Sequence, residues 1–208
     1  MSPLAAPSPR PGWTGALLVG GSSRRMGQDK LLLPWNGERL VDRAAAALRA
    51  TCPQLYCAGR DLGLPGFRHL EDARPDSGPL AGLVAALEAA GVGLVLALAG
   101  DLPGVTVEFL QALQREAELT PDRVLLPATR RGIEPLAAAW PAAGAAPLRA
   151  ALEAGQRSLH RAVRDLPHRL WPLPDSAKMR AALRNLNAPE DWRAFTGGDL
   201  PREDPDRA

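Results

Sequence analysis

The sequence predicts a single Rossmann-like α/β domain with three layers and a mostly parallel central sheet. Short apolar runs alternate along the chain with segments of helical periodicity, which is typical of successive strand–helix–strand units. One run, residues 94–99, is continuously apolar, as expected for a strand that is buried on both faces. A chain of 208 residues also buries enough surface to fold as one domain without disulfides or structural metal.

Strands are expected where short apolar runs lie between turn residues. The first, residues 15–19, ends at a pair of glycines, and the continuous run 94–99 ends at Gly100 and Asp101. In parallel sheets, ligands bind beyond the carboxyl ends of the strands, so these two ends are candidate sites. The remaining strands are expected over 55–58, 67–70, 124–127 and 169–173.

Helices are expected where apolar residues recur every three to four positions. Such residues run from Leu80 to Leu87, after Pro79 and before Gly91, and proline at the start with glycine after the end is the usual asymmetry of a helix. Thr106 is expected to cap a helix to about residue 116. The other helices are expected over 40–48, over 147–152 and, with Ser158 as its cap, over 159–166.

Both ends of the chain have the composition of linkers. Four prolines fall within residues 1–12, and glycines and prolines with interspersed charges fall within residues 196–208. These compositions predict a flexible leader and a flexible tail. The folded domain is therefore expected over residues 13–195.

Composition excludes several functional classes. The chain has two cysteines, a net charge of +2 and nine aromatic residues, which argues against a disulfide scaffold and against nucleic-acid binding. The longest apolar run, residues 91–100, is half the length of a membrane span, and no signal-peptide core is visible at the N-terminus. We expect a protein of the cytoplasm with no membrane or nucleic-acid partner.

The segment after the first strand, Gly20–Lys30, favours an anion site. Its glycine spacing fits neither a P-loop nor a dinucleotide fingerprint. Adjacent glycines nevertheless expose backbone N–H groups that hold anions, and the cations Arg24, Arg25 and Lys30 follow. A polyphosphate is the natural ligand of such a loop. The alternative is an ordinary strand-to-helix turn with solvated basic residues.

Asp101 is the candidate metal ligand. It directly follows the most apolar strand, and Mg²⁺ prefers one or two carboxylates together with phosphate oxygens and water. The alternative is a turn residue in the sequence Gly-Asp-Leu-Pro, since aspartate is common in turns.

Residues Leu18–Pro34 (LVGGSSRRMGQDKLLLP) resemble the signature loop of nucleotidyltransferases, and especially of the molybdenum cofactor guanylyltransferases of the MobA-like NTP transferase family. The resemblance extends in order over residues 14–193. The further matching segments are Glu71–Asp72 with Ser77–Gly82, Gly100–Pro103, Gly132–Leu136 and Asn185–Asp191.

This resemblance implies the fold of the nucleotide-diphospho-sugar transferases and transfer of GMP from Mg-GTP to the phosphate of molybdenum-molybdopterin. Lys30 and Arg25 would hold phosphates, Asp101 the Mg²⁺, and Asp72 the guanine edge. Base and ribose would contact the backbone of Leu18, Val19, Gly20 and Gly21. It also implies transient contacts with proteins that deliver or receive the cofactor.

The pterin side is implied to involve Asn185 and Asn187, with Glu134 nearby, because amide side chains pair with the donor and acceptor edge of a pterin. The alternative for Asn187 is capping of the helix that begins at Pro189. The sequence departs from the family pattern after the second strand, where Arg60 follows Gly59 and the family's nucleotide-contacting asparagine is absent. A backbone group of Gly59 or the side chain of Arg60 would substitute.

Other functions remain open at this point. The nearest is transfer of CMP from CTP to the same cofactor, followed by another small nucleotidyltransferase activity. A non-catalytic nucleotide-binding module is the alternative from a different class, and it would bind GTP without consuming it.

Overall fold

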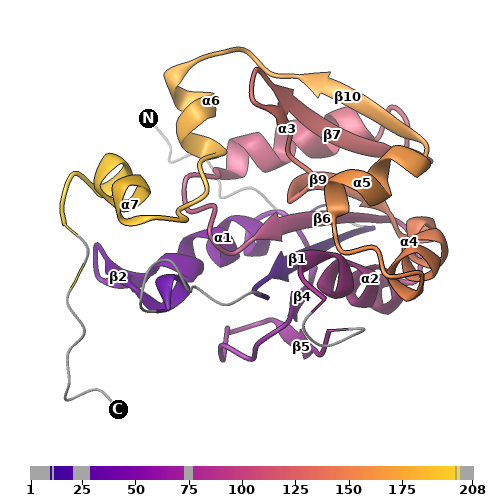
Figure 1. Cartoon of the computed structure of the whole chain (residues 1–208), viewed down its shortest axis with the longest axis horizontal. Coiled ribbons are helices and arrows are strands. Elements are labelled where there is room, and N and C mark those ends of the chain that lie inside the picture. The colour runs from indigo at the N-terminus through magenta and orange to yellow at the C-terminus, as the bar shows by residue number, and fades with distance from the viewer. Residues whose placement is uncertain (1–9, 11, 21–28, 73–76, 200, 202–208) are drawn as a thin grey trace, which may run out of the picture.

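The computed structural model describes residues 10, 12–20, 29–72, 77–199 and 201. Within these residues an eight-stranded sheet has the order β10-β7-β9-β6-β1-β4-β5, with β8 beside β7 (Figure 1). Its strands are β1 (Trp13–Leu18), β4 (Gln54–Ala58), β5 (Arg68–Leu70), β6 (Leu94–Ala99), β7 (Val124–Thr129), β8 (Gly132–Ile133), β9 (Ala137–Pro141) and β10 (His168–Pro172).

The sheet is mostly parallel. Strand β1 pairs in parallel with β4 and with β6, β4 with β5, and β10 with β7. Strands β8 and β9 are the exceptions: β9 runs antiparallel between β6 and β7, and β8 pairs antiparallel with β7. The predicted fold class is confirmed.

Helices cover both faces of this sheet. The described helices are α1 (Leu40–Arg49), α2 (Pro79–Ala90), α3 (Val107–Ala117), α4 (Ala145–Glu153), α5 (Leu159–Ala162), α6 (Ala177–Ala182) and α7 (Pro189–Thr196), and the last of these does not cover the sheet. Leu17 of β1 packs in one core with α1 and α3, and its neighbours Ala16 and Leu18 pack in a second core with α2, α4 and α5. Alternate side chains of one strand thus enter opposite layers, as the pleat requires.

All the predicted strands are present, and so are the predicted helices up to and including α4. Their ends lie within two residues of those expected. Thr106 accepts a hydrogen bond from the backbone N–H of Phe109 at 3.3 Å, as expected of a cap. Two details differ. Ser158 occupies the cap position of α5, but its side chain makes no capping hydrogen bond, and the expected helix 159–166 becomes α5 followed by a 3₁₀ turn, Val163–Asp165.

Strand β9 is not among the predicted elements. Its sequence, Ala-Ala-Ala-Trp-Pro, lacks the β-branched residues that are typical of strands. Tertiary burial overrides this preference, because Ala137, Ala138, Ala139 and Trp140 are completely buried in a strand that lies between β6 and β7.

A third apolar cluster holds the C-terminal segment against the hairpin formed by β2 (Pro34–Trp35) and β3 (Glu38–Arg39). The rings of Trp35 and Phe195 lie 4.7 Å apart, and Trp192 is buried beneath them. Figure 1 shows α7 beside β2, away from the main sheet. The cluster returns the end of the chain to the edge where β1 and β6 end.

The folded part extends slightly beyond the expected boundaries. Thr196 ends α7, and Asp199 accepts a hydrogen bond from Trp192 through its backbone oxygen at 3.0 Å. At the other end, the guanidinium of Arg10 donates to Glu118 at 2.7 and 2.8 Å. Residues 1–9 and 11 of the expected leader, and residues 200 and 202–208 of the expected tail, lie outside the described residues.

In the part of the chain that the structure describes, no helix has both the length and the apolar character needed to cross a bilayer.

Candidate active site

A cavity of about 220 Å³ lies at the carboxyl edge of the sheet. Strands β1 and β6 are parallel neighbours, so their ends at Leu18 and Ala99 meet at this edge. The cavity is lined by Leu18, Gly20, Lys30, Leu31, Pro79, Ala99, Gly100, Asp101, Leu136 and Asn187.

Three of the sequence-predicted residues meet at one ammonium group. The Nζ atom of Lys30 lies 2.5 Å from Oδ2 of Asp101 and donates to Oδ1 of Asn187 at 2.7 Å. The Lys30 and Asp101 side chains are only 15% and 17% exposed. Water therefore screens this pair less than it screens an ordinary surface ion pair.

Lys30 opens a short 3₁₀ turn, Lys30–Leu32, whose cap is Asp29. The Asp29 carboxylate accepts from the backbone N–H of Leu31 at 3.1 Å and is held in turn by the guanidinium of Arg60. Asp29 is not among the predicted site residues, and Arg60 is considered there only as a substitute for a nucleotide-contacting asparagine. Arg60 follows β4 and Asp29 follows the first loop, and spacing alone does not indicate that they meet.

Asn187 is held in place by the chain on both of its sides. The neighbouring Leu186 N–H donates to the backbone oxygen of Asp101 at 3.2 Å. The Asp191 carboxylate accepts from the backbone N–H groups of Asn187 and Ala188, both at 3.0 Å. Ala188, not Asn187, is the cap residue of α7. The capping role considered for Asn187 is thus absent, and its side chain contacts Lys30 instead.

Asp72 lies beside Gly20 and Gly82. Its Oδ2 atom is 3.6 Å from the position that a Cβ would occupy at Gly20. Its Oδ1 atom is 3.1 Å from the position that a Cβ would occupy at Gly82. Glycine at position 82, in the first turns of α2, thus leaves room for the Asp72 carboxylate against the helix. Asp72 does not line the cavity itself.

Only some of the backbone positions expected to contact base and ribose line the cavity. Leu18 and Gly20 line the cavity. Val19 is buried, and its N–H donates to the oxygen of Ala58 at 3.0 Å, so this donor is already engaged in the sheet. Gly21 and Arg25 lie outside the described residues.

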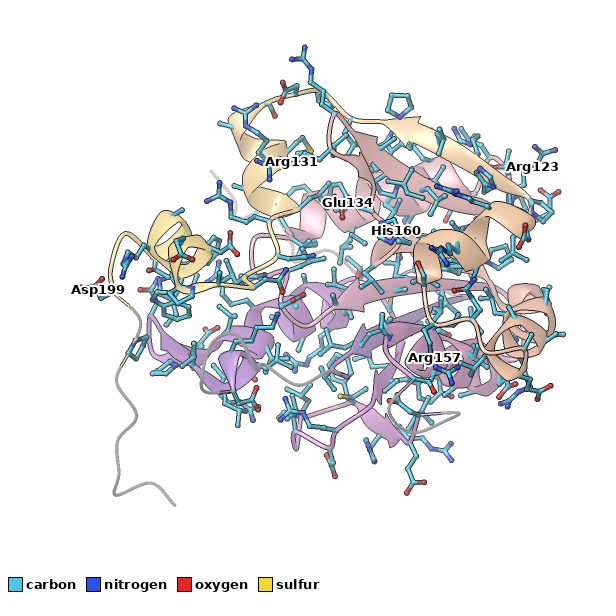
Figure 2. All side chains as sticks on the ribbon, viewed as in Figure 1. Arg123, Arg131, Glu134, Arg157, His160 and Asp199 are labelled. Atoms are coloured by element: carbon cyan, nitrogen blue, oxygen red, sulfur yellow. The ribbon has the colours of Figure 1, made fainter. Side chains whose placement is uncertain are left out.

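Glu134 and Asn185 lie near the cavity but do not line it. Glu134 is half-buried, and burial raises the pKa of its carboxyl, an effect that Arg131 partly opposes. In Figure 2 Glu134 lies between Arg131 and His160. Two residues later, Leu136 lines the cavity, and its oxygen accepts from the N–H of Ala99 at 2.9 Å.

The Oδ1 atom of Asn185 is buried and has no hydrogen-bond partner among the described residues. Buried polar atoms nearly always have a partner. This acceptor is therefore a group that a bound ligand or water would satisfy.

The described residues offer few protein ligands for a metal ion at this edge of the sheet. Among the described residues, no group of three or more His, Cys, Asp or Glu side chains is placed to hold a metal. One carboxylate at the strand end nevertheless fits Mg²⁺, which takes most of its ligands from phosphate oxygens and water. Both cysteines are free and buried, and burial raises the pKa of Cys52 to about 12 and that of Cys57 to about 11, so neither is a reactive thiolate.

Comparison with known proteins assigns a family to this arrangement. The family model described as the MobA-like NTP transferase domain matches residues 15–170. A probable molybdenum cofactor guanylyltransferase of Synechococcus elongatus is 34% identical over 190 residues, which cover 86% of this chain and 95% of the relative. The molybdenum cofactor guanylyltransferase of Xanthomonas euvesicatoria is 33% identical over 183 residues, covering 86% of this chain and 92% of that protein.

Solved structures have the same fold. The crystal structure of molybdopterin-guanine dinucleotide biosynthesis protein A from Archaeoglobus fulgidus superposes with a TM-score of 0.76 and 26% identity, covering 88% of this chain and 97% of that one. A 2-C-methyl-D-erythritol 4-phosphate cytidylyltransferase from Thermus thermophilus superposes with a TM-score of 0.63 and 16% identity, over 88% and 96% of the two chains. The second likeness concerns the fold alone.

Proposed function

Because this chain belongs to the MobA-like NTP transferase domain family, we propose that it transfers a GMP group from Mg-GTP to the phosphate of molybdenum-molybdopterin. The products are the guanine dinucleotide form of the cofactor and pyrophosphate. The observation that carries the proposal is the Lys30 ammonium, which joins the carboxylate of Asp101 and the amide of Asn187 at the strand ends.

The transfer needs no protein nucleophile, since the acceptor supplies a phosphate oxygen. That oxygen attacks the α-phosphorus of GTP and forms a new P–O bond. The bond from the α-phosphorus to the oxygen bridging to the β-phosphorus breaks, and pyrophosphate leaves with this oxygen and the bonding electron pair. Positioning and charge neutralisation supply most of the catalysis in such reactions.

Lys30 performs the neutralisation in this proposal. Its ammonium is a compact point charge on a flexible stem, and it moves from the Asp101 carboxylate to the phosphates when the nucleotide binds. Arg25, from the segment outside the described residues, would contribute a second cation. Asp101, released by Lys30, would hold Mg²⁺, which neutralises phosphate charge and polarises the α-phosphoryl group.

The two substrates would occupy opposite sides of the Lys30 ammonium. Asp72, beside Gly20 and Gly82, would accept hydrogen bonds from the N–H donors of guanine. Leu18, Gly20 and Gly21 would contact base and ribose through their backbones. Asn185 and Asn187 would pair with the pterin, with Glu134 at the margin of that subsite.

The test is pyrophosphate release by the purified protein with Mg²⁺ and molybdenum-loaded molybdopterin, in parallel with GTP and with CTP. Release with GTP alone is expected. Release with CTP alone would replace guanine by cytosine and keep the mechanism. Binding of GTP without turnover, in a folded sample, would favour a nucleotide-binding module and overturn the proposal.

We propose the cytoplasm as the compartment, on the ground that the chain's two cysteines are both free thiols. Transient contact with the proteins that deliver or receive the cofactor belongs to the same proposal.

A further inference from the structure

We propose that Arg60 is a positioning residue that sets the location of the Lys30 ammonium by holding Asp29, and that it does not bind the nucleotide itself. The proposal concerns the turn after β4, residues Gly59 and Arg60. It rests on the proposed function only in the role given to Lys30 as the phosphate ligand.

The first observation is a two-point contact between Arg60 and Asp29. The Nη1 atom of Arg60 lies 2.5 Å from Oδ2 of Asp29, and Nη2 donates to Oδ1 at 3.0 Å. A guanidinium matched to both oxygens of a carboxylate fixes the orientation of that carboxylate as well as its distance. The Asp29 side chain is only 23% exposed, which limits its freedom further.

The second observation is what Asp29 holds. Its Oδ1 accepts from the N–H of Leu31 at 3.1 Å, and its backbone oxygen accepts from the N–H of Leu32 at 3.1 Å. These bonds form the 3₁₀ turn that begins with Lys30. A displaced Asp29 carboxylate would therefore change where this turn, and with it the ammonium, lies.

The third observation is that the residue before Arg60 supports the other end of the first loop. Gly59 has φ of +108°, and a Cβ there would come within 2.9 Å of the backbone nitrogen of Gly20. The Gly59 oxygen lies 2.7 Å from Nε2 of His69, and its N–H donates to Leu70 at 3.1 Å. The turn after β4 thus lies against Gly20, near the start of the first loop, and binds Asp29, near its end.

This arrangement gives Arg60 a role other than direct substitution for a nucleotide-contacting side chain. Its guanidinium is committed to Asp29, and the backbone at Gly59 leaves no room for a side chain beside Gly20. The charge of Arg60 acts on the nucleotide through Asp29 and the Lys30 turn.

A double-mutant cycle tests this relationship. The variants are Arg60→Ala, Asp29→Asn and the double variant; asparagine retains a capping oxygen for the N–H of Leu31 but loses the charge. Each single change is expected to lower kcat/KM for GTP about 3- to 10-fold, as for the loss of a hydrogen-bonded pair that is partly open to solvent. The double variant is expected to lose no more than the larger single effect, and the KM of the acceptor stays at its wild-type value.

Arg60→Lys and Arg149→Ala complete the kinetic test. Lysine keeps the charge and is expected to recover part of the loss. Arg149 makes a comparable two-point pair with Glu88 between α4 and α2, with both side chains 38% exposed. Its removal is expected to leave kcat/KM for GTP at the wild-type value. Single effects that multiply in the double variant would show that Arg60 binds nucleotide directly, and an unchanged Arg60→Ala enzyme would overturn the proposal.

Hydrogen exchange provides a readout that does not depend on nucleotide. Amide exchange over residues 30–33 is expected to accelerate in Arg60→Ala and to stay unchanged in Arg149→Ala. Unchanged exchange in Arg60→Ala would overturn the positioning role even if catalysis fell. If exchange accelerates in Arg60→Ala but the wild-type protein binds no GTP, the result would support the role of Arg60 in holding the Lys30 turn and refute the proposed function.

Discussion

The ammonium of Lys30 and the carboxylate of Asp101 form a contact of 2.5 Å across 71 residues of sequence. Each residue follows its own strand, and the parallel pairing of β1 with β6 brings them together. The pair neutralises the cation that the proposed function assigns to phosphate and the anion that it assigns to metal. Under the proposed function, nucleotide binding would separate them, and each would be required for turnover.

Lys30→Ala is expected to lower kcat/KM for GTP by about 100-fold or more, the range seen when a group that stabilises developing charge is removed. Steady-state pyrophosphate release measures it. Arg149→Ala, which removes a cation between α2 and α4, serves as the control. A Lys30→Ala enzyme within threefold of wild type would contradict the assignment.

Asp101→Asn, which preserves shape and removes the charge, is expected to abolish pyrophosphate release while the circular dichroism spectrum remains that of the wild type. The physical reason is the loss of the carboxylate that would hold Mg²⁺. GTP affinity, measured with and without Mg²⁺, is expected to respond to the metal in the wild type and not in the variant. Undiminished turnover would remove the metal role from Asp101.

Asn185→Ala and Asn187→Ala are expected to raise the KM of the acceptor about 3- to 10-fold each, the value of a hydrogen bond to a bound ligand. The unpartnered Oδ1 of Asn185 motivates the first variant, and the exposed amide of Asn187 at the cavity the second. Kinetics at saturating GTP separate acceptor from nucleotide. An effect confined to the KM of GTP would place both residues outside the acceptor subsite.

Gly104→Ala is expected to lower the free energy of unfolding by about 1–3 kcal/mol, the cost of an overpacked site. A Cβ at this position would overlap the backbone oxygen of Ala181, where α6 packs on the segment after Asp101. Gly144→Ala is the matched control, since it has open space and a helical backbone, and it is expected to add about 0.4–1 kcal/mol. Urea denaturation of both variants measures the difference. Equal stabilities would show that α6 moves away at little cost.

Glu134→Gln is expected to change the pH dependence of stability. Burial raises the pKa of the Glu134 carboxyl in the folded protein above its ordinary value of 4.5, so the folded state binds this proton more tightly than the unfolded state. The stabilising effect of the proton is complete below pH 4.5 and is lost as pH rises through the raised pKa.

The variant has no proton to lose there. Its stability relative to the wild type should therefore rise from acid toward neutral pH in urea titrations. The variant Asp42→Asn is a contrast, because Arg39 lowers the pKa of Asp42 in the folded protein. The wild type therefore gains stability as pH rises toward 3.8, and the stability of Asp42→Asn relative to the wild type should fall over that range. A constant difference between Glu134→Gln and wild type would contradict the burial effect.

Local pattern was enough to predict most of the architecture. The run 94–99 is apolar at each position and becomes β6 with the same bounds, because no other element of that length buries both faces. Proline 79 and glycine 91 delimit α2 for reasons of backbone geometry that act within the helix itself. Asp101 could be singled out because it comes just after a readable strand, and Lys30 because it ends the glycine-rich segment that follows another; each carries a charge suited to metal or phosphate.

Contacts between distant segments were decided by tertiary structure. Strand β9 exists because three alanines and Trp140 are buried between β6 and β7, against their local preference. Asn187 contacts Lys30 because the cluster around Trp192 returns the C-terminal segment to the strand ends. Arg60 meets Asp29 because β4 lies beside β1. Charge and spacing along a chain specify what a side chain can do, whereas its partner depends on which strands pair, and that is a property of the whole packed core.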